Sequence, residues 1–192
     1  MATTAQLSIA IDAMSGDHGI EVTVPAALAV LAKHEDVCLS LVGVEEAIQG
    51  ALDRAGFVPT DRLHCIHAAE QVEMDENPAH ALRSKRDSSM RVAVDQLKAG
   101  TANACVSAGN TGALVAISRY VLRTLPGIDR PAITATIPTS TGHTHALDLG
   151  ANIDCKAEQL VQFAVMGWAL ATAIDNLDNP RIGFLNGFVA FV

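Results

Sequence analysis

Short runs of β-branched and other apolar residues alternate along the chain with longer segments in which apolar residues recur every three or four positions. The first pattern is typical of buried strands and the second of amphipathic helices. The expected strands are Leu7–Asp12, Val37–Val42, Leu63–His67, Ala104–Ser107, Ile133–Ile137, Ala146–Leu149 and Arg181–Leu185. The expected helices are Val24–Lys33, Glu45–Ala55, Ser88–Ala99, Ala113–Leu122 and Ala157–Ile174.

This alternation predicts an α/β fold. Strands separated by helices form right-handed crossovers, which give a mainly parallel, Rossmann-like sheet with helices on both faces. The length of 192 residues fits one domain, so we expect a single α/β domain over residues 1–192. Ligands of such sheets bind where strands end and loops lead into helices. The loops after strands are therefore where chemistry is expected.

Composition narrows the classes of function. Apolar residues make up 49% of the chain, which is ample for a core and excludes a disordered tail. The net charge of −8 disfavours binding to nucleic acid or to an anionic membrane, although a local basic pocket for a small anion stays possible. Met1–Ser8 lacks a signal-peptide pattern, and no run reaches the ~20 apolar residues that span a bilayer. We expect a soluble cytoplasmic protein that could still touch a membrane surface.

No metal-ligand pattern stands out. The cysteines lack C-x-x-C spacing and are expected to be small buried residues of a reducing compartment; they are Cys38, Cys65, Cys105 and Cys155. His143 and His145 flank Thr144, but a pair at this spacing without a third ligand is usually a pair of surface residues. We therefore predict no metal site.

The first chemically distinctive loop is Asp12–Gly19, which directly follows the first predicted strand. It holds Asp12, Asp17, His18 and two glycines within eight residues. Glycines let backbone N–H groups approach a ligand closely. Two aspartates repel an anion, however, so they are better suited to accept hydrogen bonds or to hold an arginine. A tight turn before a helix is the alternative interpretation.

The second loop, Ser107–Ala113, lies between a predicted strand and a helix. It matches neither the Walker pattern nor G-x-G-x-x-G. It nevertheless places Gly109, Gly112 and three small polar side chains, Ser107, Asn110 and Thr111, at a helix N-terminus, where free N–H groups and the dipole favour an anion. A phosphate site is favoured here over a well-capped turn.

The third segment, Ala81–Met90, carries three cations in an otherwise acidic chain. Arg83, Lys85 and Arg86 fall within four residues, next to hydroxyl side chains and a predicted helix start. Arginine offers bidentate contacts to an oxyanion and lysine a point charge. A solvated charged turn is the alternative.

With these segments in view, the chain resembles the bacterial phosphate acyltransferase of phospholipid synthesis, the PlsX family. The matching pieces are IAIDAMSGDHG, ALRSKRDSSM, VSAGNTGALVA, GIDRPA and LDLGANIDCK, in the family's order, between about Ile9 and Asn186. Ser15 stands where the family usually has glycine, which is expected to restrict that loop. After Asn186 the chain departs from the family, whose members are longer, so we expect the N-terminal half of a longer architecture.

The resemblance implies a reaction and a fold. Inorganic phosphate would attack the thioester of a long-chain acyl group on acyl carrier protein, giving acyl phosphate without a recognised organic cofactor. The implied fold is a three-layer α/β/α unit like those of phosphate acetyltransferases and isocitrate dehydrogenase-type enzymes. A cytoplasmic homodimer that is either soluble or peripherally associated with the membrane is also implied.

These implications assign roles to the residues of the three loops and to Asn152 of the LDLGANIDCK segment. We predict that Asn110, Lys85 and Asp12 are catalytic. We predict that the substrate is bound by Ser107, Gly109, Thr111, Gly112, Arg86, Asp17 and Asn152. Among these, Lys85 and Arg86 supply positive charge, and Asp12, Asp17 and Asn152 orient the site.

Two other functions remain open at this point. One is a phosphate acetyltransferase-like enzyme that uses a coenzyme A thioester, and the other is a non-catalytic fragment or binding module. The segment Leu160–Ile174 has almost no charged face, which is typical of a helix buried on all sides. A dimer interface is the second interpretation of that segment.

Overall fold

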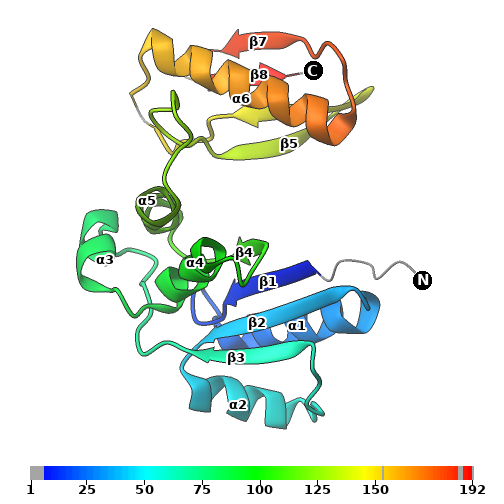
Figure 1. Cartoon of the computed structure of the whole chain (residues 1–192), viewed down its shortest axis with the longest axis vertical. Helices are drawn as coiled ribbons and strands as arrows, with labels where there is room; N and C mark the ends of the chain where they lie inside the picture. Colours follow the sequence, from blue (N-terminus) through cyan, green and yellow to red (C-terminus); the bar gives the residue numbers. More distant parts are fainter. Residues whose placement is uncertain (1–6, 153, 186–187, 192) are drawn as a thin grey trace. The chain divides into compact units, whose positions relative to one another are not determined.

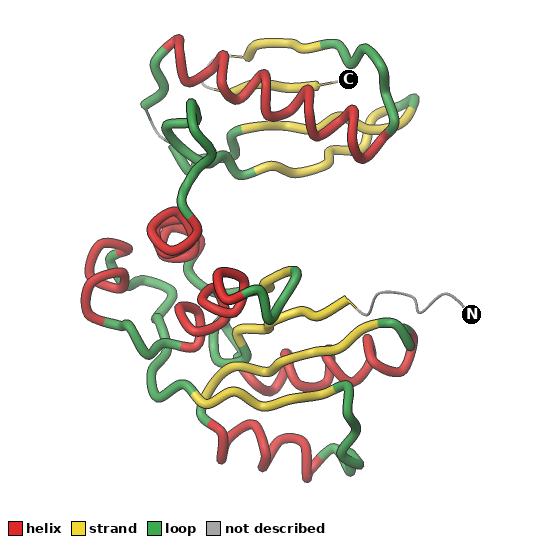
Figure 2. The backbone as a smooth tube through the Cα atoms, viewed as in Figure 1, coloured by secondary structure: helices red, strands yellow, loops and turns green. Residues whose placement is uncertain are grey.

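The computed structural model describes residues 7–152, 154–185 and 188–191, with only the backbone of the last segment. Contacts between Cα atoms divide the chain into two compact units, Met1–Arg123 and Thr124–Val192. Figures 1 and 2 show the elements of each unit, which we describe separately. The single domain expected over residues 1–192 stays a prediction.

The first unit contains the parallel sheet that the sequence predicts. Its strands are β1 (Leu7–Asp12), β2 (Val37–Gly43), β3 (Leu63–His67) and β4 (Ala104–Val106). They lie in the order β3-β2-β1-β4, and every neighbouring pair is parallel. Its helices are α1 (Ile20–Lys33), α2 (Glu45–Arg54), α3 (Pro78–Ser84), α4 (Ser89–Ala99) and α5 (Thr111–Leu122).

Strand periodicity sends alternate side chains of this sheet into two different cores. Leu39 and Leu41 of β2 pack with the buried faces of α1 and α2. Ala10 of β1 and Val42 of β2 point the other way and pack with Ala93 of α4. Helices therefore cover both faces of the sheet, and the predicted three-layer α/β/α arrangement is confirmed in this unit (Figure 1).

Local capping explains where the helices of the first unit begin and end. As predicted, α4 starts after Ser88, whose Oγ accepts the N–H of Arg91, and it ends at Gly100 with a positive φ of 73°. The sequence pattern misses α3, which is too short to show a period. Its start signal is nevertheless present, because the side chain of Asn77 caps the helix and Pro78 occupies its first position.

The second unit differs from the expectation of parallel strands. Its strands are β5 (Thr134–Thr139), β6 (Gly142–Leu147), β7 (Ile182–Leu185) and β8 (Phe188–Phe191). They form an antiparallel sheet in the order β5-β6-β8-β7. The connection between β5 and β6 is a tight turn, which can join only antiparallel strands, since a parallel pair needs a long crossover.

The long helix α6 (Ala157–Asp175) packs along this sheet with one face only. Phe163 is fully buried and packs with Leu147 of β6. On the opposite side Val161, Val165 and Trp168 are 57%, 57% and 44% exposed. The expectation of burial on all sides is therefore wrong within this unit, since only the sheet packs against α6 there and it covers one face of the helix. By length and composition alone α6 could cross a membrane, a test that core helices also pass.

The packing of β2 makes a testable prediction. Leu41→Ala should lower the free energy of unfolding by ~2–5 kcal/mol, because it removes a fully buried side chain and leaves a cavity. Leu125→Ala is the matched control, since Leu125 is 77% exposed and should lose well under 1 kcal/mol. Urea unfolding followed by circular dichroism measures both. Equal losses would contradict the assignment of this core.

Candidate anion-binding site

The site is built where β1 and β4 end. These two strands are parallel neighbours, so the loop after β1 and the loop after β4 leave the sheet at the same edge. Two glycines allow the loops to touch. A Cβ on Gly16 would lie 3.1 Å from the Cβ of Ala108, and one on Gly109 would lie 2.6 Å from the Cβ of Ser15. The structure thus brings together two of the three loops that the sequence singles out.

Asp12 and Ser107 join the two loops through a hydrogen bond. The hydroxyl of Ser107 donates to Oδ2 of Asp12 at 2.7 Å and accepts the N–H of Gly109 at 3.1 Å. Asp12 is fully buried, and its Oδ1 and the Oγ of Ser15 have no partner among the described residues. Asp12 therefore orients Ser107 and keeps one acceptor free beside the loops.

Both polar groups of the Asn110 side chain form hydrogen bonds within the protein. Its Oδ1 caps α5 by accepting the N–H of Ala113 at 3.0 Å. Its Nδ2 faces three backbone carbonyls, and the shortest of these contacts is 2.8 Å, to Glu76. Because both hydrogens of the amide are engaged, this geometry favours a positioning role. The predicted catalytic role of Asn110 stays untested.

The N-terminus of α5 keeps free donors. No hydrogen bond within the described residues uses the N–H of Thr111 or of Gly112, and both residues are exposed. The first turn of α5 also carries no acidic residue, so no carboxylate within that turn offsets the positive end of the helix dipole. A Cβ on Gly112 would lie 2.9 Å from Cγ of Pro78, so α3 also approaches this point. This end of α5 can hold an oxyanion.

The three cations at the end of α3 are not equivalent. Nζ of Lys85 lies 3.1 Å from Oε2 of Glu76 and donates to the carbonyl of Gln71 at 2.7 Å. Nε of Arg83 donates to the carbonyl of Ala79. Arg86 is exposed and forms no hydrogen bond or ion pair within the part of the chain that is described. Of the two predicted ligands, Arg86 is the one whose charge is available.

Glu76 lies at the centre of a small charged cluster with His80 and Lys85. Desolvation raises the pKa of this carboxyl, but hydrogen bonds from His80, Lys85 and the N–H of Glu73 outweigh it, so the pKa is lowered from its usual 4.5. Glu76 is therefore ionised at neutral pH and neutralises Lys85. Sequence reasoning missed this partner, which lies nine residues from Lys85 across α3.

Asp17 lies at the rim of a small pocket. The pocket has a volume of about 190 Å³ and is lined by residues 15–19 of the first loop, the start of α1, and Ala108 of the second loop. Asp17 is exposed there. Its predicted role in orienting the site stays a prediction, but it does share a pocket with the second loop.

Asn152 belongs to the second unit, where its contacts are structural. Its Nδ2 donates to the carbonyl of Pro131 at 3.0 Å and to Oδ2 of Asp148 at 2.9 Å. Asp148 is buried and also accepts the N–H groups of Ile133 and Asn152. Asn152 thus closes a loop in its own unit, and its predicted contribution to the phosphate site stays a prediction.

The cysteines and histidines differ from expectation in burial. All four cysteines are free but only partly buried, so the expectation of full burial is wrong. Burial, with a smaller effect of the Asp12 charge, raises the pKa of the Cys105 thiol to about 11, so it is no nucleophile at neutral pH. The expectation of two surface histidines is wrong for His145, which is 5% exposed because its strand turns it toward α6.

The fold defines the class to which this chain belongs. It resembles EutD phosphotransacetylase from Staphylococcus aureus with a TM-score of 0.63 at 15% identity, over 92% of this chain and 56% of that one. The likeness places the chain among α/β proteins of the phosphotransacetylase fold, as the sequence predicts.

The family is defined more closely by sequence. Residues 7–188 match the family described as "Fatty acid synthesis protein". Phosphate acyltransferase of Legionella pneumophila (strain Paris) is 55% identical over 94% of this chain, and that of Methylococcus capsulatus is 57% identical over 93%. The chain belongs to this phosphate acyltransferase family. It spans about half the length of these curated relatives, since the alignments cover 53% of each.

The charged cluster around Glu76 gives a prediction on pH. A lowered pKa means that the folded state favours the ionised carboxylate, so its stabilisation is present above pH 4.5 and lost as the pH falls below that value. Glu76→Gln should lower the free energy of unfolding by roughly 1 kcal/mol or less at neutral pH. The difference from the unmodified chain should shrink in acid.

Urea unfolding at several pH values measures this difference. Glu35→Gln is the control, because Glu35 is exposed and has no partner among the residues described. A Glu76→Gln deficit that stays constant in acid would show that the carboxylate charge is not what stabilises the cluster.

Proposed function

We propose that the chain supplies the phosphate-binding half of a phosphate acyltransferase that moves a long-chain acyl group from acyl carrier protein to inorganic phosphate. The observation that carries this proposal is the N-terminus of α5, whose unused N–H groups, those of Thr111 and Gly112, follow Ser107 by four and five residues in a chain of this family. The product would be an acyl phosphate for phospholipid synthesis.

The chemistry suits such a site. An oxygen of phosphate attacks the thioester carbonyl carbon, the C–S bond breaks, and the carrier's phosphopantetheine sulfur leaves as a thiolate. A thiolate leaves readily, so no strong general acid is required. Orientation of the phosphate and donors to the developing oxyanion then supply catalysis, at ~3–4 kcal/mol for one good hydrogen bond.

The proposed roles follow the geometry. The N–H groups of Thr111 and Gly112 would hold phosphate oxygens, joined by the hydroxyl of Thr111. Ser107 and Gly109, whose hydroxyl and N–H hydrogens are already used within the loops, would shape the loop around the phosphate. Arg86 would add a charge-assisted contact. Lys85, which is already paired with Glu76, would adjust the electrostatic potential around the phosphate. Asp12 would hold the Ser107 hydroxyl in place.

An activity assay distinguishes acyl carrier protein from coenzyme A as the donor of the acyl group. The assay measures phosphate-dependent release of free thiol from an acylated carrier protein and from a long-chain acyl-coenzyme A, by this chain and by a full-length relative. Release from the carrier protein by this chain supports the proposal. Release only from the coenzyme A ester favours a phosphotransacetylase-like enzyme, and release only by the relative favours a non-catalytic fragment.

Phosphate binding itself tests the role of Arg86. Arg86→Gln should weaken phosphate binding about tenfold or more, since hydrogen bonds to charged groups contribute ~1.5–3 kcal/mol. Isothermal titration of this chain with inorganic phosphate measures the dissociation constant. Arg83→Gln is the matched control, because the Arg83 guanidinium lies three residues away on α3 and bonds to its own helix. Equal effects of both substitutions would remove Arg86 from the site.

We also propose that the exposed stripe of α6 forms a homodimer interface. Val161, Val165 and Trp168 follow one another at helical spacing on the side of α6 that faces away from its sheet. Apolar stripes of this kind mark interaction surfaces. We also propose that exposed apolar surface makes peripheral contact with a membrane. Both proposals place the protein in the cytoplasm.

A charge in this stripe should break the dimer. Val165→Glu is expected to shift the chain from dimer to monomer in multi-angle light scattering. Val58→Glu introduces the same charge at a position that is 74% exposed in the first unit and should leave the dimer intact. A monomeric unmodified chain would refute the interface.

A further inference from the structure

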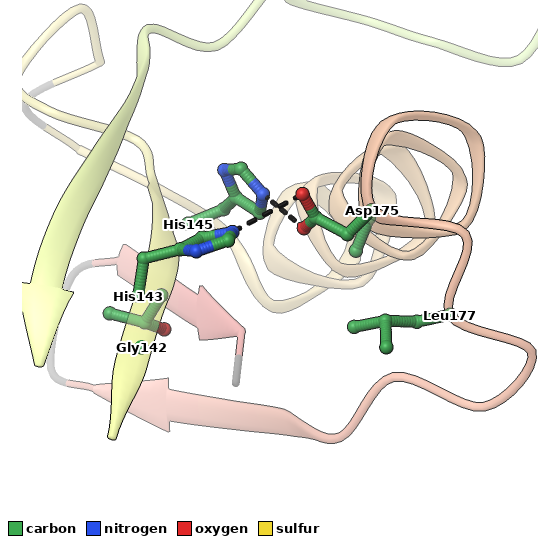
Figure 3. Close-up of a pocket in the computed structure, with 7 residues that line it drawn as sticks. Gly142, His143, His145, Asp175 and Leu177 are labelled. Carbon is green, nitrogen blue, oxygen red and sulfur yellow. Dashed lines mark hydrogen bonds and ion pairs between the residues drawn. The ribbon is translucent and has the colours of Figure 1, made fainter.

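The second unit holds a cluster of three metal-ligating side chains that the proposed acyl transfer does not use. Nε2 of His145 lies 2.7 Å from Oδ2 of Asp175, and Nε2 of His143 lies 3.2 Å from Oδ1 of the same carboxylate. The ligand atoms of all three residues lie within 4.8 Å of one another. Figure 3 shows both rings turned toward Asp175. We propose that His143, His145 and Asp175 bind a divalent transition-metal ion such as Zn²⁺.

The strand and the helix bring these ligands together. His143 and His145 are two residues apart on β6, so their side chains leave the same face of the sheet. That face carries α6, whose last residue is Asp175. The imidazole rings pack edge to face with centroids 5.2 Å apart, and both Nε2 atoms are directed at the Asp175 carboxylate.

The spacing of the donors fits the size of the ion. Zinc binds histidine nitrogen and carboxylate oxygen at about 2.0–2.2 Å, so two ligands at a tetrahedral angle lie about 3.3 Å apart. The N···O separations of 2.7 and 3.2 Å are close to that value, and no two of the three ligand atoms are more than 4.8 Å apart. Two imidazoles with one carboxylate favour zinc over calcium or magnesium, which prefer oxygen ligands.

A contact outside the cluster orients the buried ligand. Nδ1 of His145 lies 3.1 Å from Oγ1 of Thr136, which is its direct neighbour across the β5–β6 pair. Metal-bound histidines usually make such a hydrogen bond through their other ring nitrogen, because it fixes the ring and the tautomer. His145 is therefore held with Nε2 directed at Asp175.

The electrostatics of α6 also favour a cation at this point. Asp175 lies at the C-terminal end of the helix, where the dipole is negative and a carboxylate is unfavourable. The last turn of α6 contains no basic residue that would offset this charge. A bound cation would complement both the carboxylate and the helix end.

The cluster opens to solvent on one side. It lines a pocket of about 260 Å³ together with Gly142, Ala171 and Leu177, and the His143 side chain is 44% exposed. An ion can enter there, and three protein ligands leave a fourth position for water. The ion would tie the C-terminal end of α6 to β6 and so stabilise the second unit.

Direct metal titration tests the proposal. The whole chain is stripped with a chelator, dialysed, and titrated with Zn²⁺ in a calorimeter and with Co²⁺ in a spectrophotometer. We expect one ion per chain with a dissociation constant in the micromolar range or tighter. The Co²⁺ spectrum should show visible bands of tetrahedral nitrogen and oxygen coordination without thiolate charge-transfer absorption.

Substitutions assign the ligands. His143→Gln and Asp175→Asn should each weaken Zn²⁺ binding at least tenfold, and Zn²⁺ should raise the melting temperature of the unmodified chain more than that of either variant. His64→Gln, which removes an exposed histidine of the first unit, is the matched control and should bind as the unmodified chain does. His143 is partly exposed, so its variant should fold even if the other does not.

Three results would overturn the proposal. One is the absence of stoichiometric binding, which would leave the cluster as a hydrogen-bonded clasp. Another is binding of unchanged affinity in the His143→Gln and Asp175→Asn variants. The third is a thiolate band in the Co²⁺ spectrum, which would place the ion on the cysteines.

Discussion

The candidate site depends on one constraint, the parallel pairing of β1 with β2 on one side and with β4 on the other. Parallel strands end at the same edge, so the loops after β1 and β4 must meet there. They meet closely enough that Gly16 and Gly109 leave little or no room for a side chain. The hydrogen bond from Ser107 to Asp12 then locks the two loops together.

Backbone donors, more than side-chain cations, would give the proposed site its affinity for an anion. The chain carries a net charge of −8, and Lys85 is neutralised by Glu76. The end of α5 remains positive because the N–H groups of Thr111 and Gly112 are unused and no carboxylate occupies its first turn. Such a helix end favours a small oxyanion, while the net negative charge disfavours polyanions, as the proposed phosphate site requires.

The sheets of the two units are covered by helices in different ways. In the first, helices cover both faces of a parallel sheet, and the ligand-facing loops lie at one edge. In the second, α6 covers one face of an antiparallel sheet and leaves its own outer stripe exposed. That difference explains why the first unit holds the loops of the proposed acyl transfer, while the second offers a surface and a histidine cluster.

The sequence by itself determined the elements of the first unit and the loops that carry its chemistry. The strand Leu7–Asp12, the cap at Ser88 and the glycine turns are local patterns, because apolar period, capping and backbone freedom act within a few residues. The same local reasoning placed Ser107 and Asn110 at the start of a helix.

Only the tertiary structure decided what those residues contact. The Asn110 side chain donates to backbone carbonyls more than thirty residues earlier in the chain, and His145 contacts Asp175, thirty residues later. The position of β8 between β6 and β7 in the second unit was decided in the same way. Such contacts depend on how elements pack in three dimensions, and neither periodicity nor spacing along the chain carries that information.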